Sequence, residues 1–128
     1  MRELTGHILG PGSDKLKISV LDEPGSGGAN HHYMLTTPDW TRAPDGANPR
    51  GVWDIQFQNG PIAEAGVNGV THEALLEIVA DRLRSFQAGP FACRENAFAL
   101  AKIEEAQFWL QRRTLERMRR GVEGKSIA

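Results

Sequence analysis

Hydrophobic residues in the second half of the chain repeat at helical spacing. Between Thr71 and about Ala88 they recur three and four residues apart, which predicts an amphipathic helix. Thr71 is expected to cap the start of this helix, and Gly89-Pro90 to end it. The apolar positions are Leu75, Leu76, Val79, Leu83 and Phe86.

A second, longer helix is predicted from about Phe91 to Arg120, where Gly121 stops it. The link between the helices is so short that they should be antiparallel neighbours, forming a helical hairpin over residues 70–121. At the rise of an α-helix the second is about 45 Å long and the first about 27 Å. Because the overhang still carries large apolar residues, we expect the small sheet and another protomer to cover them, which makes the protein a homo-oligomer. These residues are Phe108, Trp109, Leu110, Leu115 and Met118.

The first 60 residues alternate with a period of two, which is typical of half-buried strands. Strands are expected over about 15–21, 31–37 and 53–57, with a glycine-rich turn at Pro24–Gly28. Residues 38–50 and 60–69 are predicted loops. The predicted fold class is α+β in a single domain of 128 residues: a small antiparallel sheet of about three strands within residues 1–60, followed by the long antiparallel hairpin.

Charge and cysteine content narrow the function classes. The formal net charge is −1, which argues against a partner of long nucleic acid, since such binding needs a concentrated positive surface. From Ala92 onward, however, eight Lys and Arg oppose five Asp and Glu. Cys93 is the only cysteine, so no disulfide can form within the chain and the cytoplasm is its natural compartment. Because no apolar run is long enough for a signal peptide or a membrane span, we expect no membrane partner.

Three residues of the hairpin suit a ligand site. Asn96 and Arg113 are 17 positions apart on one predicted helix, so their Cα atoms should be about 25 Å apart. One small ligand can touch both only if they come from different protomers. Alternatively, Asn96 belongs to the helix start and Arg113 is a solvated charge that suits the helix dipole. Phe86 is by default a core residue, but at the mouth of the hairpin turn it could also stack on a purine base.

The basic end of the second helix has two interpretations. A solvated face explains most of its arginines. Guanidinium groups that converge on an oligomer axis would instead form an anion site. These residues are Arg112, Arg117, Arg119 and Arg120.

Signals for catalysis are weak. The segment Gly10–Lys15 lacks the order of a phosphate-binding loop and indicates a turn. His31 and His32 would point to opposite faces of a strand, and Cys93 is expected to be a small buried thiol. Adjacent Glu104 and Glu105 are more typical of solvated or paired side chains than of a catalytic dyad. We therefore expect no metal, no cofactor and no enzymatic activity.

The segment from Ile55 to Gly124 resembles a known family. Its distinctive motifs are FQNGP, GVNGVT, GPFACRENAFAL, WLQRRT and a terminal RGVEG. Together they are similar to the phage Thoeris anti-defence sponges, whose helical hairpin is shared with the anti-CBASS cyclic-nucleotide sponges. The strands that precede this segment are compatible with this family but are not distinctive of it.

The resemblance implies a non-catalytic phage protein in the cytoplasm of the infected bacterial host. It would sequester cyclic ADP-ribose-type second messengers, notably glycocyclic ADP-ribose, and in some members cyclic di- or trinucleotides, and so block Thoeris and CBASS effectors. It also implies a hexamer, a trimer of dimers, with pockets between protomers. Phe86, Asn96 and Arg113 match the family's stacking aromatic, asparagine and arginine, whereas Arg117 and Arg120 are candidates for a second, cyclic-oligonucleotide site on a symmetry axis.

The resemblance also implies that some relatives have a basic residue in the loop before the first helix, whereas this chain has no Lys or Arg between Arg50 and Arg82. That contact is either missing or replaced by backbone donors of residues 66–69.

Other functions stay open from the residues themselves. The main alternative is a structural or adaptor oligomer that uses the hairpin only for self-assembly. A nucleic-acid binder that uses the arginine end and an enzyme that degrades the same messengers are further alternatives.

Overall fold

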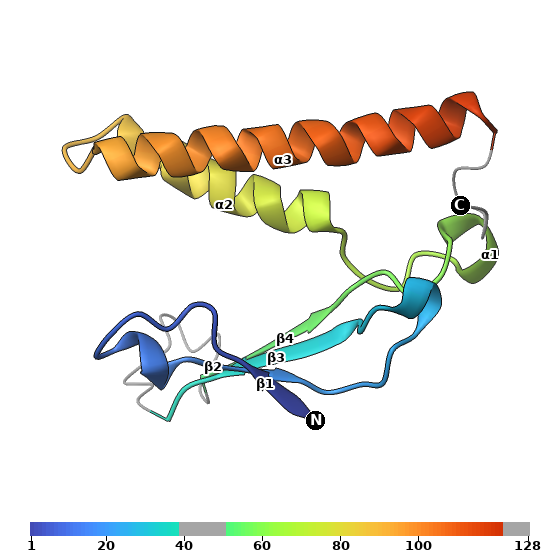
Figure 1. The fold of residues 1–128 in the computed structure, drawn as a ribbon, viewed down its shortest axis with the longest axis horizontal. Coiled ribbons are helices and arrows are strands. Elements are labelled where there is room, and N and C mark those ends of the chain that lie inside the picture. The colour runs from blue at the N-terminus through green and yellow to red at the C-terminus, as the bar shows by residue number, and fades with distance from the viewer. Residues whose placement is uncertain (39–50, 122–128) are drawn as a thin grey trace. The chain divides into compact units, whose positions relative to one another are not determined.

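The computed structural model describes residues 1–38 and 51–121 of the chain. Two compact units are formed, residues 1–60 and 61–128. The first holds a β-sheet and the second holds the helices (Figure 1). The loop predicted over 38–50 lies, apart from Pro38, outside the described residues.

The sheet has four antiparallel strands in sequence order, where about three were predicted. They are β1 (Arg2–Leu4), β2 (Lys17–Val20), β3 (His32–Thr36) and β4 (Val52–Gln56). The additional strand is β1, whose three residues are too short to show alternation. Its position depends on its partner, because Arg2 pairs with Val20 and Leu4 with Ile18.

The register of the sheet collects its apolar residues on one face. Val20 is 1% exposed, and the Tyr33 and Phe57 rings meet edge to face with centroids 5.6 Å apart. Residues opposite one another in antiparallel strands share a face, so this side forms the core of the first unit. Its members on β2, β3 and β4 are Ile18, Val20, Tyr33, Leu35, Trp53 and Ile55.

The turns of the first unit agree with the sequence predictions. Gly10–Lys15 is a turn that ends in the 3₁₀ helix η1 (Ser13–Lys15), and Gly12 adopts a φ of 100° there. Between β2 and β3 lies the 3₁₀ helix η2 (Ser26–Gly28). Gly27 and Gly28 have φ angles of 74° and 80°, the left-handed region that favours glycine.

A short helix interrupts the predicted loop over 60–69. Helix α1 (Ile62–Ala65) is a single turn that begins after Pro61, whose carbonyl accepts the backbone N–H groups of Glu64 and Ala65. Gly66 ends it with a φ of 74°. One turn of helix in small residues leaves no periodic signal, which is why the sequence indicated only a loop.

The two long helices form the predicted antiparallel hairpin (Figure 1). Helix α2 (His72–Gln87) is capped by Thr71, whose side chain accepts the N–H of Ala74 at 3.2 Å. Helix α3 (Arg94–Arg119) begins about three residues later than predicted, because residues 91–93 belong to the turn. It ends at the predicted stop, Gly121, whose φ is 74°. At about 1.5 Å per residue, α2 is about 24 Å long and α3 about 39 Å, so the predicted overhang is confirmed.

The helices meet along a heptad-like seam, whose positions alternate spacings of three and four residues. Ala80 lies at its middle and is fully buried, while most other members are half-buried. On α2 the seam consists of Glu73, Leu76, Ala80, Leu83 and Gln87, and on α3 of Asn96, Leu100, Ile103, Gln107 and Leu110.

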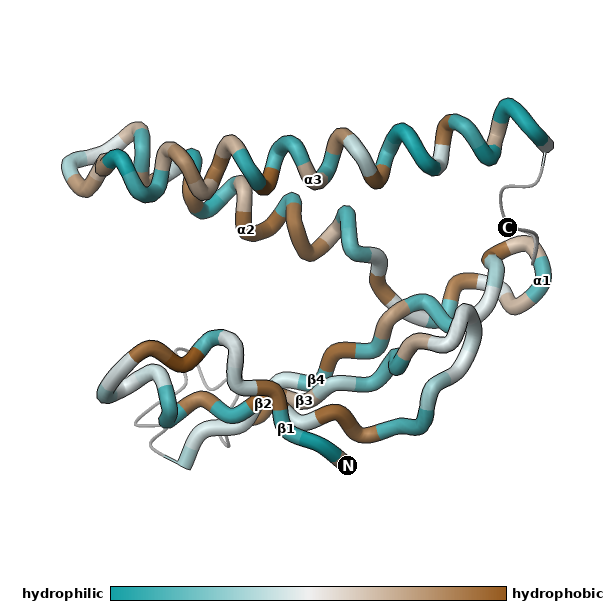
Figure 2. The backbone as a smooth tube through the Cα atoms, viewed as in Figure 1, coloured by the Kyte–Doolittle hydropathy of each residue, from teal (hydrophilic) through white to brown (hydrophobic). Residues whose placement is uncertain are grey.

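Apolar side chains lie outside this seam as well. Phe86 is 37% exposed, so the default expectation that it belongs to the core is wrong. On α3 the side chains of Phe108, Trp109, Leu115 and Met118 are each more than half exposed in the protomer, and apolar positions recur along the whole helix (Figure 2). Within the described residues, no helix is both long and apolar enough to cross a bilayer.

The other face of the sheet carries a polar cluster. His32 Nε2 lies 2.5 Å from Asp54 Oδ1, and Gln56 Nε2 donates to Asp54 Oδ2 at 3.2 Å. The contact with His32, and then that with Gln56, lowers the pKa of Asp54 below its ordinary value. The cluster thus joins β3 to β4 through a charged carboxylate.

This cluster predicts a pH-dependent stability. An aspartate whose pKa is lower in the folded than in the unfolded protein stabilises the fold above its unfolded pKa of about 3.9, and that stabilisation is lost as the pH falls through the folded pKa. Asp54→Asn should therefore be less stable than the wild type near pH 7, and the difference should shrink below about pH 4. Urea unfolding at both pH values measures it. An equal difference at both would contradict the prediction.

Candidate functional site

The turn between α2 and α3 is held by the side chain of Gln87. Its Nε2 donates to the carbonyl of Cys93 at 3.1 Å, and its Oε1 accepts the N–H of Cys93 at 3.0 Å. A primary amide can satisfy both backbone groups of one residue at once, so Gln87 fixes both ends of the link.

Cys93 is exposed rather than buried, which corrects the sequence expectation. Its Sγ accepts the backbone N–H of Asn96 at 3.5 Å and so caps α3. The first N–H groups of a helix have no partner within the helix, and the thiol satisfies one of them. The start of α3, where Asn96 lies, is thereby positioned relative to the end of α2.

A pocket of about 620 Å³ opens beside this turn. Its volume falls within the range of roughly 300–1,000 Å³ that is usual for small-molecule sites. One wall comes from α2 and consists of Ile78, Asp81, Arg82, Ser85 and Phe86, and the other is formed by turn residues 89–91.

Two aromatic rings and one cation dominate the pocket. Phe86 faces it from α2 and Phe91, 75% exposed, from the turn. Arg82 lies one helical turn before Phe86 and places its Cζ 5.2 Å from the centroid of the Phe86 ring, a cation–π contact. Within residues 1–38 and 51–121, the Arg82 guanidinium makes no hydrogen bond or ion pair. The pocket therefore combines flat apolar surface with an available positive charge.

The hydroxyl of Ser85 in this pocket is engaged with the backbone. Ser85 Oγ donates to the carbonyl of Asp81 at 3.1 Å, and no side-chain base among the described residues accepts a hydrogen bond from it. No His or Cys is among the described residues that line the pocket. Elsewhere in the described ranges, no group of three or more His, Cys, Asp and Glu side chains is arranged to hold a metal ion.

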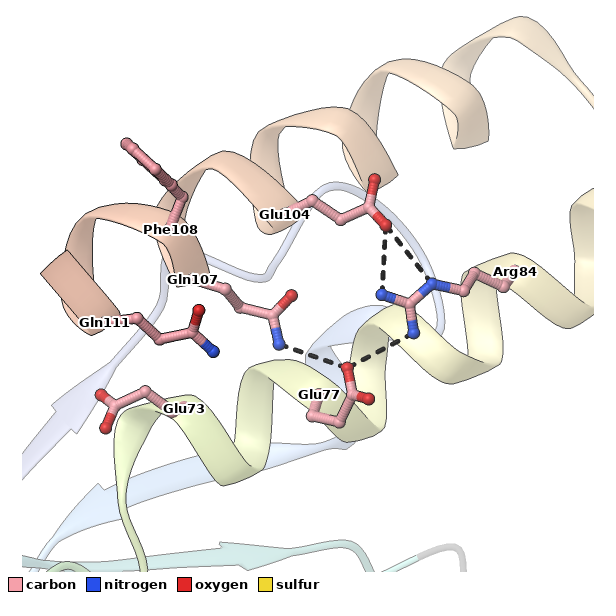
Figure 3. Close-up of a pocket in the computed structure, with 7 residues that line it drawn as sticks. All are labelled: Glu73, Glu77, Arg84, Glu104, Gln107, Phe108 and Gln111. Carbon is pink, nitrogen blue, oxygen red and sulfur yellow. Dashed lines mark hydrogen bonds and ion pairs between the residues drawn. The ribbon is translucent and has the colours of Figure 1, made fainter.

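A second pocket, of about 470 Å³, lies along the other side of the helix pair (Figure 3). Hydrogen bonds and ion pairs among Arg84, Glu77, Glu104 and Gln107, here called the Arg84 clasp, link the two helices in this pocket. Arg84 donates to Glu77 and Glu104 at 3.3 and 3.1 Å, and Gln107 donates to Glu77 at 3.3 Å. The hydrogen bonds from Gln107 and then Arg84 lower the pKa of Glu77, and that to Glu104 is the main cause of the raised pKa of Arg84.

The clasp has a structural consequence and an electrostatic one. It confirms that Glu104 is paired with a basic residue, as the sequence suggested, and it links α2 to α3 at a defined register. Since Glu73, Glu77 and Glu104 all line this pocket, its charge disfavours an anionic ligand.

The structure separates the residues predicted for one ligand. Phe86 lines the first pocket, whereas neither Asn96 nor Arg113 does. Asn96 is half-buried just inside α3, and its side-chain amide has no hydrogen bond within the described part of the chain. Arg113 is exposed near the opposite end of α3, and it has no ion pair within the described part of the chain. Because α3 is one unbroken helix, the two are about 25 Å apart in one protomer.

The arginines at the end of α3 differ from one another. Arg117 is only 8% exposed, so it is not part of a fully solvated face. Arg119 pairs with Glu116 through two close contacts of 2.8 and 2.9 Å. Arg112 and Arg119 line a third pocket of about 380 Å³, and Arg120 is exposed after the end of the helix.

Sequence reasoning missed three residues of the site. Arg82 and Phe91 line the pocket, and Gln87 holds its turn. The four-residue spacing of Arg82 and Phe86, which places them on the same side of a helix, was the one signal available for Arg82. The sequence carried no signal for Gln87, because the partner of this side chain is the backbone of a turn whose conformation the sequence does not reveal.

Comparison with known proteins assigns the hairpin to a family. The family model described as Acb2/Tad1, hairpin domain, matches residues 52–115, half of the chain. This chain belongs to the Acb2/Tad1 hairpin domain family. The match includes Phe86, Asn96 and Arg113, whereas Arg117 and Arg120 lie beyond it.

A curated relative supports the same assignment. The chain is 54% identical over 70 residues to the protein Thoeris anti-defense 1 of Bacillus phage SBSphiJ7. The aligned segment covers 55% of this chain and 49% of the relative, so the chain matches about half of the relative's length. The resemblance noted from the sequence motifs to the phage Thoeris anti-defence sponge family is therefore confirmed.

The Gln87 contacts predict that this side chain stabilises the Acb2/Tad1 hairpin. Gln87→Ala should lower the free energy of unfolding by roughly 1–2 kcal/mol, since two hydrogen bonds of about 1 kcal/mol each are lost. Thermal and urea unfolding of the two proteins measure the difference.

Gln111→Ala is the matched control, because Gln111 lies on α3 without a hydrogen bond among the described residues. It should change stability by less than about 0.5 kcal/mol. Equal effects of the two substitutions would show that the Gln87 contacts do not hold the turn.

Proposed function

We propose that this chain is a phage anti-defence protein that binds and sequesters cyclic ADP-ribose-type second messengers, notably glycocyclic ADP-ribose, without cleaving them. Its family and its similarity to a protein named Thoeris anti-defense 1 support the anti-defence role. The observation that carries the binding step is the partly exposed ring of Phe86 in a pocket of small-molecule size. An aromatic ring that stacks on a base contributes about 1–3 kcal/mol.

The remaining contacts come from Asn96 and Arg113. The Asn96 amide can both donate to and accept from a ribose or base, and the Arg113 guanidinium can pair with a phosphate. Since the two are about 25 Å apart on one helix, a complete site takes Asn96 and Arg113 from different protomers. A ligand of this size is thus enclosed only in an oligomer.

The exposed apolar side chains of α3 support such an oligomer. Leaving four large apolar residues of one helix more than half exposed is costly in water, and a second copy that covers them would recover about 25 cal/mol for each Å² buried. The proposed assembly is a homo-oligomer, specifically a hexamer arranged as a trimer of dimers. Its place of action is the cytoplasm of the infected bacterial host.

Sequestration works by mass action. The protein must bind its messenger more tightly than the effector does, and a nanomolar dissociation constant corresponds to about −12 kcal/mol. The effector of the Thoeris system is then deprived of its signal while the messenger stays chemically intact. The pocket chemistry supports this mechanism, because the Ser85 hydroxyl donates to a backbone carbonyl and to no side-chain base among the described residues.

Cyclic di- and trinucleotides are a second proposed ligand class, through which CBASS effectors would also be blocked. Arg117 and Arg120 are the proposed contacts, at the end of α3 that an oligomer axis would bring together. Arg120 is exposed, whereas Arg117 would have to leave its buried position to reach a ligand.

The alternative is a structural or adaptor oligomer. The same exposed apolar residues on α3 favour self-assembly whether or not a nucleotide is bound. This alternative leaves the ring of Phe86 and the free cation beside it without a role.

Retention of an intact messenger distinguishes these functions. The protein is mixed with glycocyclic ADP-ribose or a cyclic trinucleotide, free ligand is removed by filtration, and the protein is heated and its released contents are identified by mass spectrometry. The proposal requires recovery of intact messenger. Hydrolysed product would indicate an enzyme, and an oligomer without retained ligand would favour the structural alternative.

The two-protomer site predicts the effect of one arginine. Arg113→Ala should weaken the binding of glycocyclic ADP-ribose by about tenfold or more, because a charge-assisted contact to phosphate is lost, while the oligomer measured by light scattering stays intact. Titration calorimetry measures the affinity. Lys102→Ala is the matched control, since Lys102 is a highly exposed cation of the same helix paired only with Glu105 among the described residues. If both variants bind as the wild type does, Arg113 is not in the site.

A further inference from the structure

Within one protomer, anion recognition at the Phe86 pocket needs a cation that lines the pocket. The preceding segment supplies none, because no Lys or Arg occurs between Arg50 and Arg82. Arg113, the cation proposed to complete the site, is distant on the same protomer. Arg82 is the one Lys or Arg among the described residues that line the pocket.

The neighbouring arginines differ from Arg82 in what they already contact. Arg84 follows two residues later, about 200° further around the helix, and is engaged by Glu77 and Glu104. Arg94, at the start of α3, lies over the ring of Phe98 with its Cζ 5.2 Å from the centroid. Arg82 also lies over a ring, but that ring is Phe86, in the wall of the pocket.

The contact with Phe86 leaves the donors of Arg82 available. A guanidinium group packed on an aromatic face keeps its N–H groups at its edge, where they can donate to an anion. Asp81 lines the same pocket but forms no ion pair with Arg82. Among the described residues, the charge is therefore held in place by a cation–π contact and is not neutralised by a carboxylate.

We propose that Arg82 is a specificity-determining residue of this pocket, which donates to a phosphate of a nucleotide whose base packs against Phe86. The inference rests on the function proposed above and adds a phosphate contact from the same protomer that supplies the stacking ring. It makes the pocket selective for nucleotides over nucleosides.

Affinities for a phosphorylated and an unphosphorylated ligand test this role. Cyclic ADP-ribose and adenosine are titrated into the full-length wild-type protein and into the variants Arg82→Gln, Arg82→Lys and Phe86→Ala. Lys102→Gln, which also removes an exposed cation, is the matched control. Arg82→Gln should weaken cyclic ADP-ribose binding about tenfold or more and adenosine binding less than about threefold, and Arg82→Lys should lie between wild type and Arg82→Gln. Phe86→Ala should weaken both ligands.

The salt dependence of cyclic ADP-ribose binding provides a second readout, which does not require measurable adenosine binding. Losing one charge contact should make the affinity of Arg82→Gln fall less steeply with salt than that of the wild type, whereas Lys102→Gln should follow the wild type. If Arg82→Gln weakens the binding of both ligands equally and leaves the salt dependence unchanged, Arg82 only supports the Phe86 ring, and the proposal is overturned. Wild-type affinity in Arg82→Gln would also overturn it while leaving the proposed function in place. A wild-type protein that binds neither cyclic ADP-ribose nor glycocyclic ADP-ribose would overturn both.

Discussion

The close approach of α2 and α3 at Ala80 is the constraint on which the hairpin depends. Ala80 is fully buried, and a side chain of this size lets the two helices pack with Leu83 and Ile103 along one seam. On either side of it, polar contacts fix the relative position of the helices: the Arg84 clasp along the pair and the Gln87 amide at the turn. Packing supplies the attraction between the helices, and these hydrogen bonds select one register out of several that apolar packing would allow.

The unequal lengths of the two helices link this seam to assembly. Helix α2 covers only part of α3, so the last turns of α3 continue past their partner with Leu115 and Met118 exposed. The same length places Asn96 and Arg113 too far apart to serve one small ligand within a protomer. The greater length of α3 therefore accounts both for the proposed self-association and for the proposed ligand site shared between copies.

Helix α2 presents opposite chemistry on two of its sides. Arg82 and Phe86 are four residues apart and face the apolar pocket, while Glu77 and Arg84 are seven residues apart and face the clasp. On the clasp side the positive charge of Arg84 is matched by carboxylates, whereas on the pocket side Arg82 rests on a ring and keeps its donors. A phosphate is attracted to an unpaired cation far more than to one already neutralised, which supports the proposed anion recognition on the Phe86 side.

The sequence by itself determined the strands β2, β3 and β4, both long helices and their antiparallel pairing, because period-two and three-to-four residue spacings follow from local backbone geometry. It also pointed to Phe86, Asn96 and Arg113, through motifs that belong to the family. Only the tertiary structure decided the short elements β1 and α1, whose three and four residues carry no period. It likewise decided that Cys93 is an exposed cap, that Phe86 lies partly outside the core and that Arg117 is buried while Arg82 is available. These properties depend on which side chains from distant positions come to surround each residue, and local spacing does not encode that.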